Sequence, residues 1–87
     1  MEMNQPDRKT CEIWHNGRLL FVDSAGGFVA GMGRTRKSVS PETWPPEFAD
    51  HYSRAITEHH RDLDNAIERR DKTIRIQDIT YELRWKD

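Results

Sequence analysis

Two largely apolar stretches flank Asn16-Gly17 within CEIWHNGRLLFVD at residues 11–23. Because Asn-Gly favours the positive φ angles of a two-residue turn, the pattern predicts a β-hairpin. Its register pairs residues outward from the turn: His15 with Arg18, Trp14 with Leu19, Ile13 with Leu20, Glu12 with Phe21 and Cys11 with Val22. One face then carries Cys11, Ile13, Leu20 and Val22, and the other carries Glu12, Trp14, Leu19 and Phe21.

Both faces of this predicted hairpin are largely apolar. One helix covers one face of a small sheet and leaves the other open. We therefore weigh two outcomes for Trp14, Leu19 and Phe21. Either they belong to the core beneath the C-terminal segment, or they form an apolar patch that a partner or a second copy of the chain covers.

Glycine and proline punctuate the middle of the chain. Residues 24–27 form a turn-rich joint, and Phe28 to Met32 predict a short third strand interrupted by Gly31. The stretch from Gly33 to Glu47 contains three prolines, none of which suits the interior of a strand or helix. The pattern predicts a three-stranded meander followed by a loop.

A long amphipathic pattern follows the loop. From Phe48 the apolar positions recur in steps of three and four, which indicates one helix to about Arg70. The stripe consists of Phe48, Tyr52, Ala55, Ile56, His59, Leu63, Ala66 and Ile67. The opposite side is charged, as a solvated helix face is.

The C-terminal stretch alternates again, with Ile79, Tyr81, Leu83 and Trp85 on one side. The alternation slips at Gln77-Asp78, so residues 73–85 form either one strand with a bulge or a tight hairpin. The expected fold is α+β in the order β-β-β-α-β: a small antiparallel sheet, made of the three-stranded meander plus a C-terminal strand, packed against one long helix. Residues 1–9 read as a loose polar leader and residues 10–87 as a single domain.

The composition of the chain bears on its class and on its cellular compartment. The chain has 87 residues, 34% hydrophobic and 33% charged, with a formal net charge of −1. It has no apolar run near the roughly 20 residues of a membrane span and no apolar signal centre at its N-terminus, which favours a cytoplasmic protein. The single cysteine, Cys11, has no partner for an internal disulfide, and we expect it to be buried.

Motifs with chemical meaning are weak. His60-Arg61-Asp62-Leu63 matches the start of a kinase catalytic loop, but the expected Asn and a phosphate-binding loop are missing. The glycines at 26–33 lack dinucleotide or Walker spacing. His60 and Asp64 share a helix face, yet two ligands make a poor metal site. We therefore expect no catalytic residue, no cofactor and no metal.

The favoured function is binding. We expect a small non-enzymatic protein that occupies a surface of a larger protein or nucleoprotein partner. Phage and mobile-element inhibitors of host machinery, such as anti-CRISPR proteins, act in this way. The candidate contacts are Trp14, Leu19, Phe21, Arg34, Arg36, Lys37 and Trp44. The alternative is a DNA- or RNA-binding module that uses the basic loop 34–37 beside the sheet. Against it, residues 41–87 contain 11 acidic and 8 basic residues.

Overall fold

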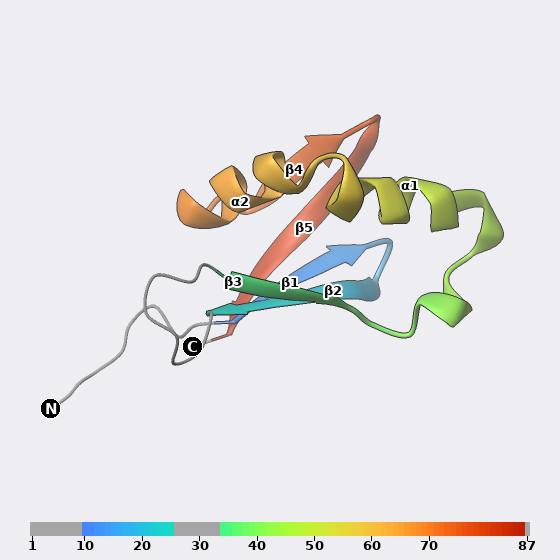
Figure 1. Ribbon diagram of the computed structural model, residues 1–87, viewed down its shortest axis with the longest axis horizontal. Helices are drawn as coiled ribbons and strands as arrows, with labels where there is room; N and C mark the ends of the chain where they lie inside the picture. The colour runs from blue at the N-terminus through green and yellow to red at the C-terminus, as the bar shows by residue number, and fades with distance from the viewer. Residues whose placement is uncertain (1–9, 26–33, 87) are drawn as a thin grey trace, which may run out of the picture.

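The computed structural model describes residues 10–25 and 34–86, which form an antiparallel five-stranded sheet with two helices on one side (Figure 1). The elements are β1 (Thr10–His15), β2 (Arg18–Ala25), β3 (Arg34–Ser38), the short 3-10 helix η2 (Pro41–Thr43), α1 (Pro46–Thr57), α2 (His60–Glu68), β4 (Thr73–Ile76) and β5 (Ile79–Lys86). The strand order is β3-β2-β1-β5-β4, so β1 lies at the centre. The α+β class is confirmed, but the element order is β-β-β-α-α-β-β.

The strand beside β2 is not where the sequence pattern placed it. The predicted strand at residues 28–32 lies outside the described residues, whereas Arg34–Ser38, predicted as loop, forms β3. The loop prediction was wrong here because the three prolines that support it all lie beyond Ser38. A strand rich in arginine and lysine suits a sheet edge, where cations discourage pairing with other chains.

The first hairpin departs from its predicted register by one residue. His15 faces Arg18 and Trp14 faces Leu19, as predicted. Beyond them a bulge shifts the pairing, so that Ile13 faces Phe21, Glu12 faces Val22 and Cys11 faces Asp23. The bulge lets two consecutive apolar residues, Leu20 and Phe21, face the core, and both are fully buried. Burying a second large side chain contributes about 2 kcal/mol, which favours the bulge over a regular ladder.

The predicted long helix is two helices. α1 ends at Thr57 and α2 begins at His60, with His59 at a φ of −120° between them. The residues between Ile56 and Leu63 include no large apolar side chain, so nothing holds a continuous helix against the sheet there. Both helices still direct their apolar stripes inward, through Tyr52 and Ala55 in α1 and Leu63, Ala66 and Ile67 in α2.

The C-terminal segment is a hairpin, so the hairpin interpretation is confirmed and the single bulged strand is wrong. Gln77 and Asp78 form its two-residue turn with φ angles of 51° and 71°. β5 pairs with β4 on one side and with β1 on the other. Two hairpins thus meet at β1 and β5 and form the centre of the sheet.

The two faces of the sheet differ in what covers them. Cys11, Ile13 and Tyr81 point to the inner face and pack beneath the helices in one hydrophobic core. Both helices lie on the same side (Figure 1), and within residues 10–25 and 34–86 no element covers the opposite side. We call this opposite side the outer face. Alternation along the strands assigns to it Thr10, Glu12, Trp14, Leu19, Val22, Ser24, Thr35, Lys37, Thr73, Arg75, Thr80, Glu82, Arg84 and Lys86.

Candidate binding surface

Three of the sequence-predicted contact residues lie on the outer face. Trp14 and Leu19 face each other across β1 and β2, and both are half-buried. Lys37 extends from β3 on the same face, opposite Val22, and is exposed. β1 and β2 therefore present a short apolar row of Trp14, Leu19 and Val22. Lys37 adds a cation beyond it on the edge strand β3.

Phe21 and Trp44 belong to the core and not to the outer face. Phe21 is fully buried because the bulge turns it inward, and Trp44 is 8% exposed. Their rings meet edge to face with centroids 5.6 Å apart. The Trp44 ring also meets the Tyr52 ring of α1, with centroids 5.4 Å apart. Trp44 therefore packs the segment before α1 against both β2 and α1. Phe21 is therefore a core residue, but it lies on the inner face with Ile13 and Trp44 and not beneath the C-terminal segment.

Arg34 and Arg36 have different positions in β3. Arg34 begins the strand opposite Ala25. Arg36 points to the inner face, where its Nε donates to Asp23 Oδ2 at 2.9 Å and its Nη2 donates to Asp64 Oδ1 at 2.6 Å. The guanidinium of Arg36 is thereby engaged in joining α2 to the sheet, so this arginine is not displayed for a ligand.

Trp14 is held on the outer face by two neighbouring side chains. The Arg84 guanidinium carbon lies 4.1 Å from the centroid of the Trp14 ring, a cation–π contact. The indole Nε1 donates to Glu12 Oε1 at 3.0 Å. β5 supplies Arg84 because it pairs directly with β1, which places Trp14 opposite Glu82. The indole is therefore oriented before any partner arrives, which lowers the entropy cost of binding.

The carboxylates around Trp14 are balanced by cations. Arg84 donates to Glu82 through Nε at 2.8 Å and through Nη2 at 3.2 Å. These hydrogen bonds lower the pKa of Glu82 and raise that of Arg84. Lys86 Nζ lies 3.7 Å from Glu12 Oε2. Such exposed pairs add little stability, but they fix the plane of Arg84 over the indole.

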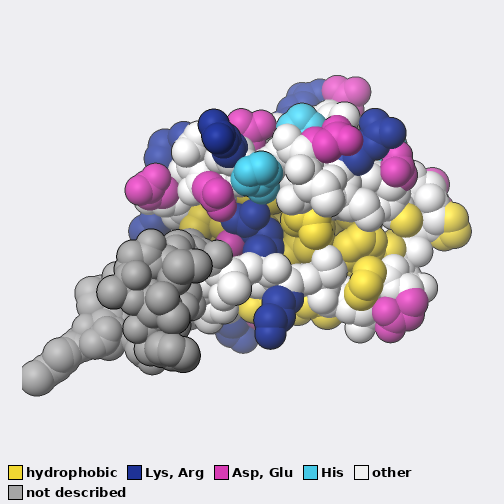
Figure 2. Space-filling view, in the orientation of Figure 1, with side chains coloured by type: hydrophobic (Ala, Val, Ile, Leu, Met, Phe, Trp, Pro, Cys, Tyr) yellow, Lys and Arg dark blue, Asp and Glu magenta, His cyan; other side chains and the backbone are white. Residues whose placement is uncertain are grey.

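Charge differs between the two layers of the molecule. The stretch 46–68 carries six carboxylates, Glu47, Asp50, Glu58, Asp62, Asp64 and Glu68, against two arginines, Arg54 and Arg61. The outer face carries four cations, Lys37, Arg75, Arg84 and Lys86, against Glu12 and Glu82. Figure 2 shows charged side chains over the helix layer and a hydrophobic band between that layer and the strands below it. The helix layer is acidic, and the outer face is mildly basic.

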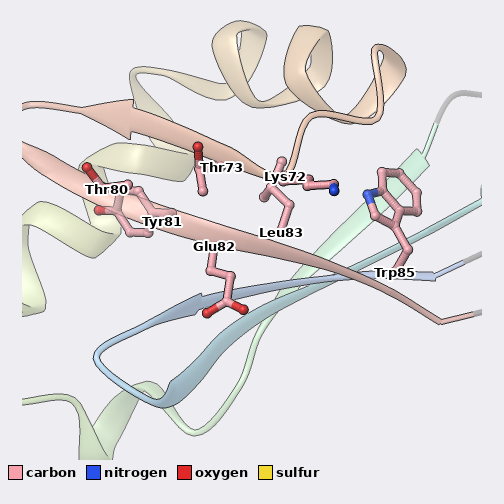
Figure 3. Close-up of a pocket in the computed structure, with 7 residues that line it drawn as sticks. All are labelled: Lys72, Thr73, Thr80, Tyr81, Glu82, Leu83 and Trp85. Atoms are coloured by element: carbon pink, nitrogen blue, oxygen red, sulfur yellow. The ribbon is translucent and has the colours of Figure 1, made fainter.

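A groove lies beside the first residue of β4, Thr73, where β5 continues without β4 as its neighbour. It has a volume of about 630 Å³, and it is lined by Lys72, Thr73, Thr80, Tyr81, Glu82, Leu83 and Trp85. In Figure 3 the side chain of Lys72 extends toward the Trp85 indole, while that of Glu82 points to the other side of β5. The groove shares its two threonines with the outer face, so the two surfaces are continuous.

The titratable side chains of the described residues are spread over the core and the surface. In the ranges 10–25 and 34–86 no three or more His, Cys, Asp or Glu side chains come together as a metal site would require. The His15 ring packs between Phe48, Tyr52 and Tyr81 inside the aromatic cluster. Burial lowers the pKa of His15 and raises those of Tyr52 and Tyr81. Tyr52 and Tyr81 are core residues, and the half-buried His15 packs against both.

Comparison with known proteins returned no relative: no family model, no curated protein and no solved structure matches the chain. None of the helices in the described part of the chain is long and apolar enough to cross a membrane. The functional interpretation therefore depends on the geometry of the outer face.

Sequence reasoning missed the residues of β5 that complete this surface. Glu82 and Arg84 lie on the polar side of an alternating strand, a pattern that the sequence does show. What the pattern lacks is the pairing of β5 with β1, which brings them to Trp14. Such long-range pairing leaves no local signal in a single sequence.

Proposed function

We propose that this chain is a non-enzymatic protein-binding module that acts by occupying a surface of a larger protein, with its outer face as the contact surface. The carrying observation is the arrangement at Trp14: a half-buried indole on the central strand, held beneath Arg84 and bonded to Glu12. Tryptophan and arginine are the residues most enriched at the energetic centres of protein interfaces. Leu19 and Val22 extend the apolar area beside the indole, and Lys37 and Lys86 belong to a charged rim.

A nucleic-acid partner is less favoured by the same geometry. A base stacked on Trp14 would bring its phosphates near Glu12 and Glu82, which flank the indole. The basic cluster at 34–37 also contributes less than its sequence suggests, because Arg36 is engaged with Asp23 and Asp64. Few cations remain for phosphate contacts, and affinity for nucleic acid grows with their number.

Inhibition of a larger assembly is the mode of action that suits such a module. A small chain that covers a working surface of its partner needs no active site, only a rigid complementary face. We include in the proposal the class of phage and mobile-element inhibitors, anti-CRISPR proteins among them. Support comes from the preorganised indole on the outer face.

The test is affinity capture of the tagged protein from a host lysate, with and without nuclease. The variant Trp14→Ala/Leu19→Ser removes the apolar centre of the outer face, and Arg61→Ala/Asn65→Ser changes two exposed residues of α2 as a matched control. We expect a stoichiometric protein partner that survives nuclease, is retained by the control and is lost by the outer-face variant. Circular dichroism checks that both variants are folded.

Three results contradict the proposal. Capture of nucleic acid alone would mean that the chain is a nucleic-acid-binding module instead. Equal loss of the partner with both variants would remove the outer face from the interface. Recovery of only a second copy of the chain, with sedimentation as a dimer that Trp14→Ala/Leu19→Ser dissociates, would make the outer face a homodimer interface instead.

A further inference from the structure

The groove beside Trp85 exists because the two strands of the second hairpin differ in length. β4 pairs with β5 only as far as Thr73 opposite Glu82, and the Lys72 carbonyl accepts the last bond, from Leu83 N at 2.8 Å. The chain enters β4 there from the end of α2, while β5 continues beside β1 to Lys86 opposite Thr10. A volume of about 630 Å³ is left along this step, large enough for several side chains of an extended segment.

The end of α2 brings a cation to the groove. Arg70 adopts a left-handed conformation with a φ of 58°, while Arg70 N donates to Ile67 O and Asp71 N donates to Ala66 O. This is the Schellman arrangement, in which glycine is the usual residue at the left-handed position. With arginine there, the guanidinium carbon lies 4.1 Å from the centroid of the Trp85 ring. The arginine costs backbone energy and places a positive charge on the aromatic wall.

Lys72 is an exposed cation in the lining of the groove, and Arg70 is a second exposed cation beside Trp85. Glu82 also belongs to the lining, but its carboxylate is paired with Arg84 at 2.8 Å and its side chain points away from Lys72 (Figure 3). Asp71 is paired with Arg69 at 2.8 Å. A carboxylate entering beside Lys72 would therefore meet a cation and the Thr73 hydroxyl, with Leu83 and Trp85 as an apolar wall.

We infer that this groove receives an extended acidic segment of the protein partner, with a carboxylate beside Lys72 and an apolar side chain against Trp85. The inference rests on the proposed function, because the groove shares Thr73 and Thr80 with the outer face. The acidic helix layer would repel such a segment, so the charge asymmetry between the layers orients the approach toward the sheet.

The test uses two capped synthetic peptides, one of glutamates around a single leucine and its counterpart with lysines in place of the glutamates. Each is titrated into the folded protein, and the Trp85 indole N–H and the Lys72 and Thr73 amides are followed by NMR. We expect the glutamate peptide to shift these resonances and the lysine peptide not to. Raising the salt concentration should weaken the binding, because the ions screen the contact with Lys72.

Charge reversal locates the contact. Lys72→Glu is expected to weaken the glutamate peptide about fivefold, which is the size of one lost and one reversed surface ion contact. Arg61→Glu makes a matching charge reversal on the exposed side of α2, outside the proposed contact surfaces, and is expected to leave the affinity unaltered. Both side chains are exposed, so neither substitution threatens the fold.

Three results would overturn the inference: equal shifts with the lysine peptide, equal weakening by Lys72→Glu and Arg61→Glu, or a single-stranded oligonucleotide that shifts Trp85 more than the glutamate peptide does. Its failure is distinguishable from failure of the proposed function. If partner capture depends on Trp14 while the groove ignores the peptide, only the groove inference is wrong. If capture is indifferent to Trp14, the proposed function is wrong whatever the peptide does.

Discussion

The Arg36 guanidinium lies 2.9 Å from the carboxylate of Asp23, which is fully buried between the sheet and the helices. The same guanidinium reaches Asp64 on α2 at 2.6 Å. One side chain from an edge strand thus neutralises a buried anion and fastens the second helix to the inner face. This contact holds α2 on the inner face, and the outer face is the side of the sheet that the helices do not cover.

Replacing Arg36 with methionine should destabilise the fold. Arg36→Met keeps the aliphatic volume but removes the guanidinium that faces the buried Asp23 carboxylate, so we expect a loss of about 3 kcal/mol in the free energy of unfolding. Arg61→Met, on the exposed side of α2, is the control and should change this free energy by less than about 0.5 kcal/mol. Urea denaturation measures both, and equal midpoints for the two variants would show that Asp23 does not depend on Arg36.

Two buried tyrosines should respond in opposite directions to loss of their hydroxyl groups. The Tyr81 hydroxyl is buried and finds no hydrogen-bond partner among the described residues, so Tyr81→Phe should stabilise the protein by about 1 kcal/mol. The Tyr52 hydroxyl bonds to His15 Nδ1 at 2.5 Å, and Tyr52→Phe should destabilise by about 1 kcal/mol. Thermal unfolding compares the pair; destabilisation of similar size in both variants would refute the distinction.

Local patterns predicted the elements that local chemistry determines. Asn16-Gly17 marked the first hairpin, and the helical stripe predicted Tyr52, Leu63 and Ile67 as buried. The slip at Gln77-Asp78 marked the second turn. In each case the signal comes from residues within a few positions of one another, which a single sequence displays.

The features that the sequence did not predict depend on distant contacts. The bulge at Leu20 exists because the core accepts both Leu20 and Phe21, and the pattern of one strand contains no information about the size of that core. The pairing of β5 with β1 completes the surface around Trp14, yet these strands lie far apart in the chain. For the same reason Trp44, which looked like an exposed loop residue, is in the core against Phe21.

The stability of the protein should depend on pH through His15. Burial lowers the pKa of its imidazole below the usual 6.5, so the unfolded chain binds a proton more readily than the folded one. Stability from this group is therefore present above pH 6.5 and is lost as the pH falls from there through the lowered folded pKa. In His15→Gln the unfolding free energy should fall less steeply over that window. Parallel pH profiles for the two proteins would contradict this account.

The second turn carries strain that glycine would relieve. Asp78 has a φ of 71°, close to the 74° of Gly17 in the first turn. Asp78→Gly should raise the free energy of unfolding by about 1 kcal/mol, because only a β-carbon clash and a weak exposed contact with Arg75 are lost. Gly17→Ala makes the reverse change and should lower it by a similar amount. Chemical denaturation measures both, and a destabilised Asp78→Gly would mean that the turn depends on the Asp78 carboxylate.

The central claim, that the outer face binds a protein, is tested most directly by photo-crosslinking in the host cell. A photoreactive amino acid replaces Leu19 on the outer face in one version of the protein and Asn65 on the exposed side of α2 in another. The account predicts a discrete protein adduct from position 19 that disappears when Trp14→Ala is added, and none from position 65. An adduct from position 65 alone, or one from position 19 that is indifferent to Trp14→Ala, would contradict it.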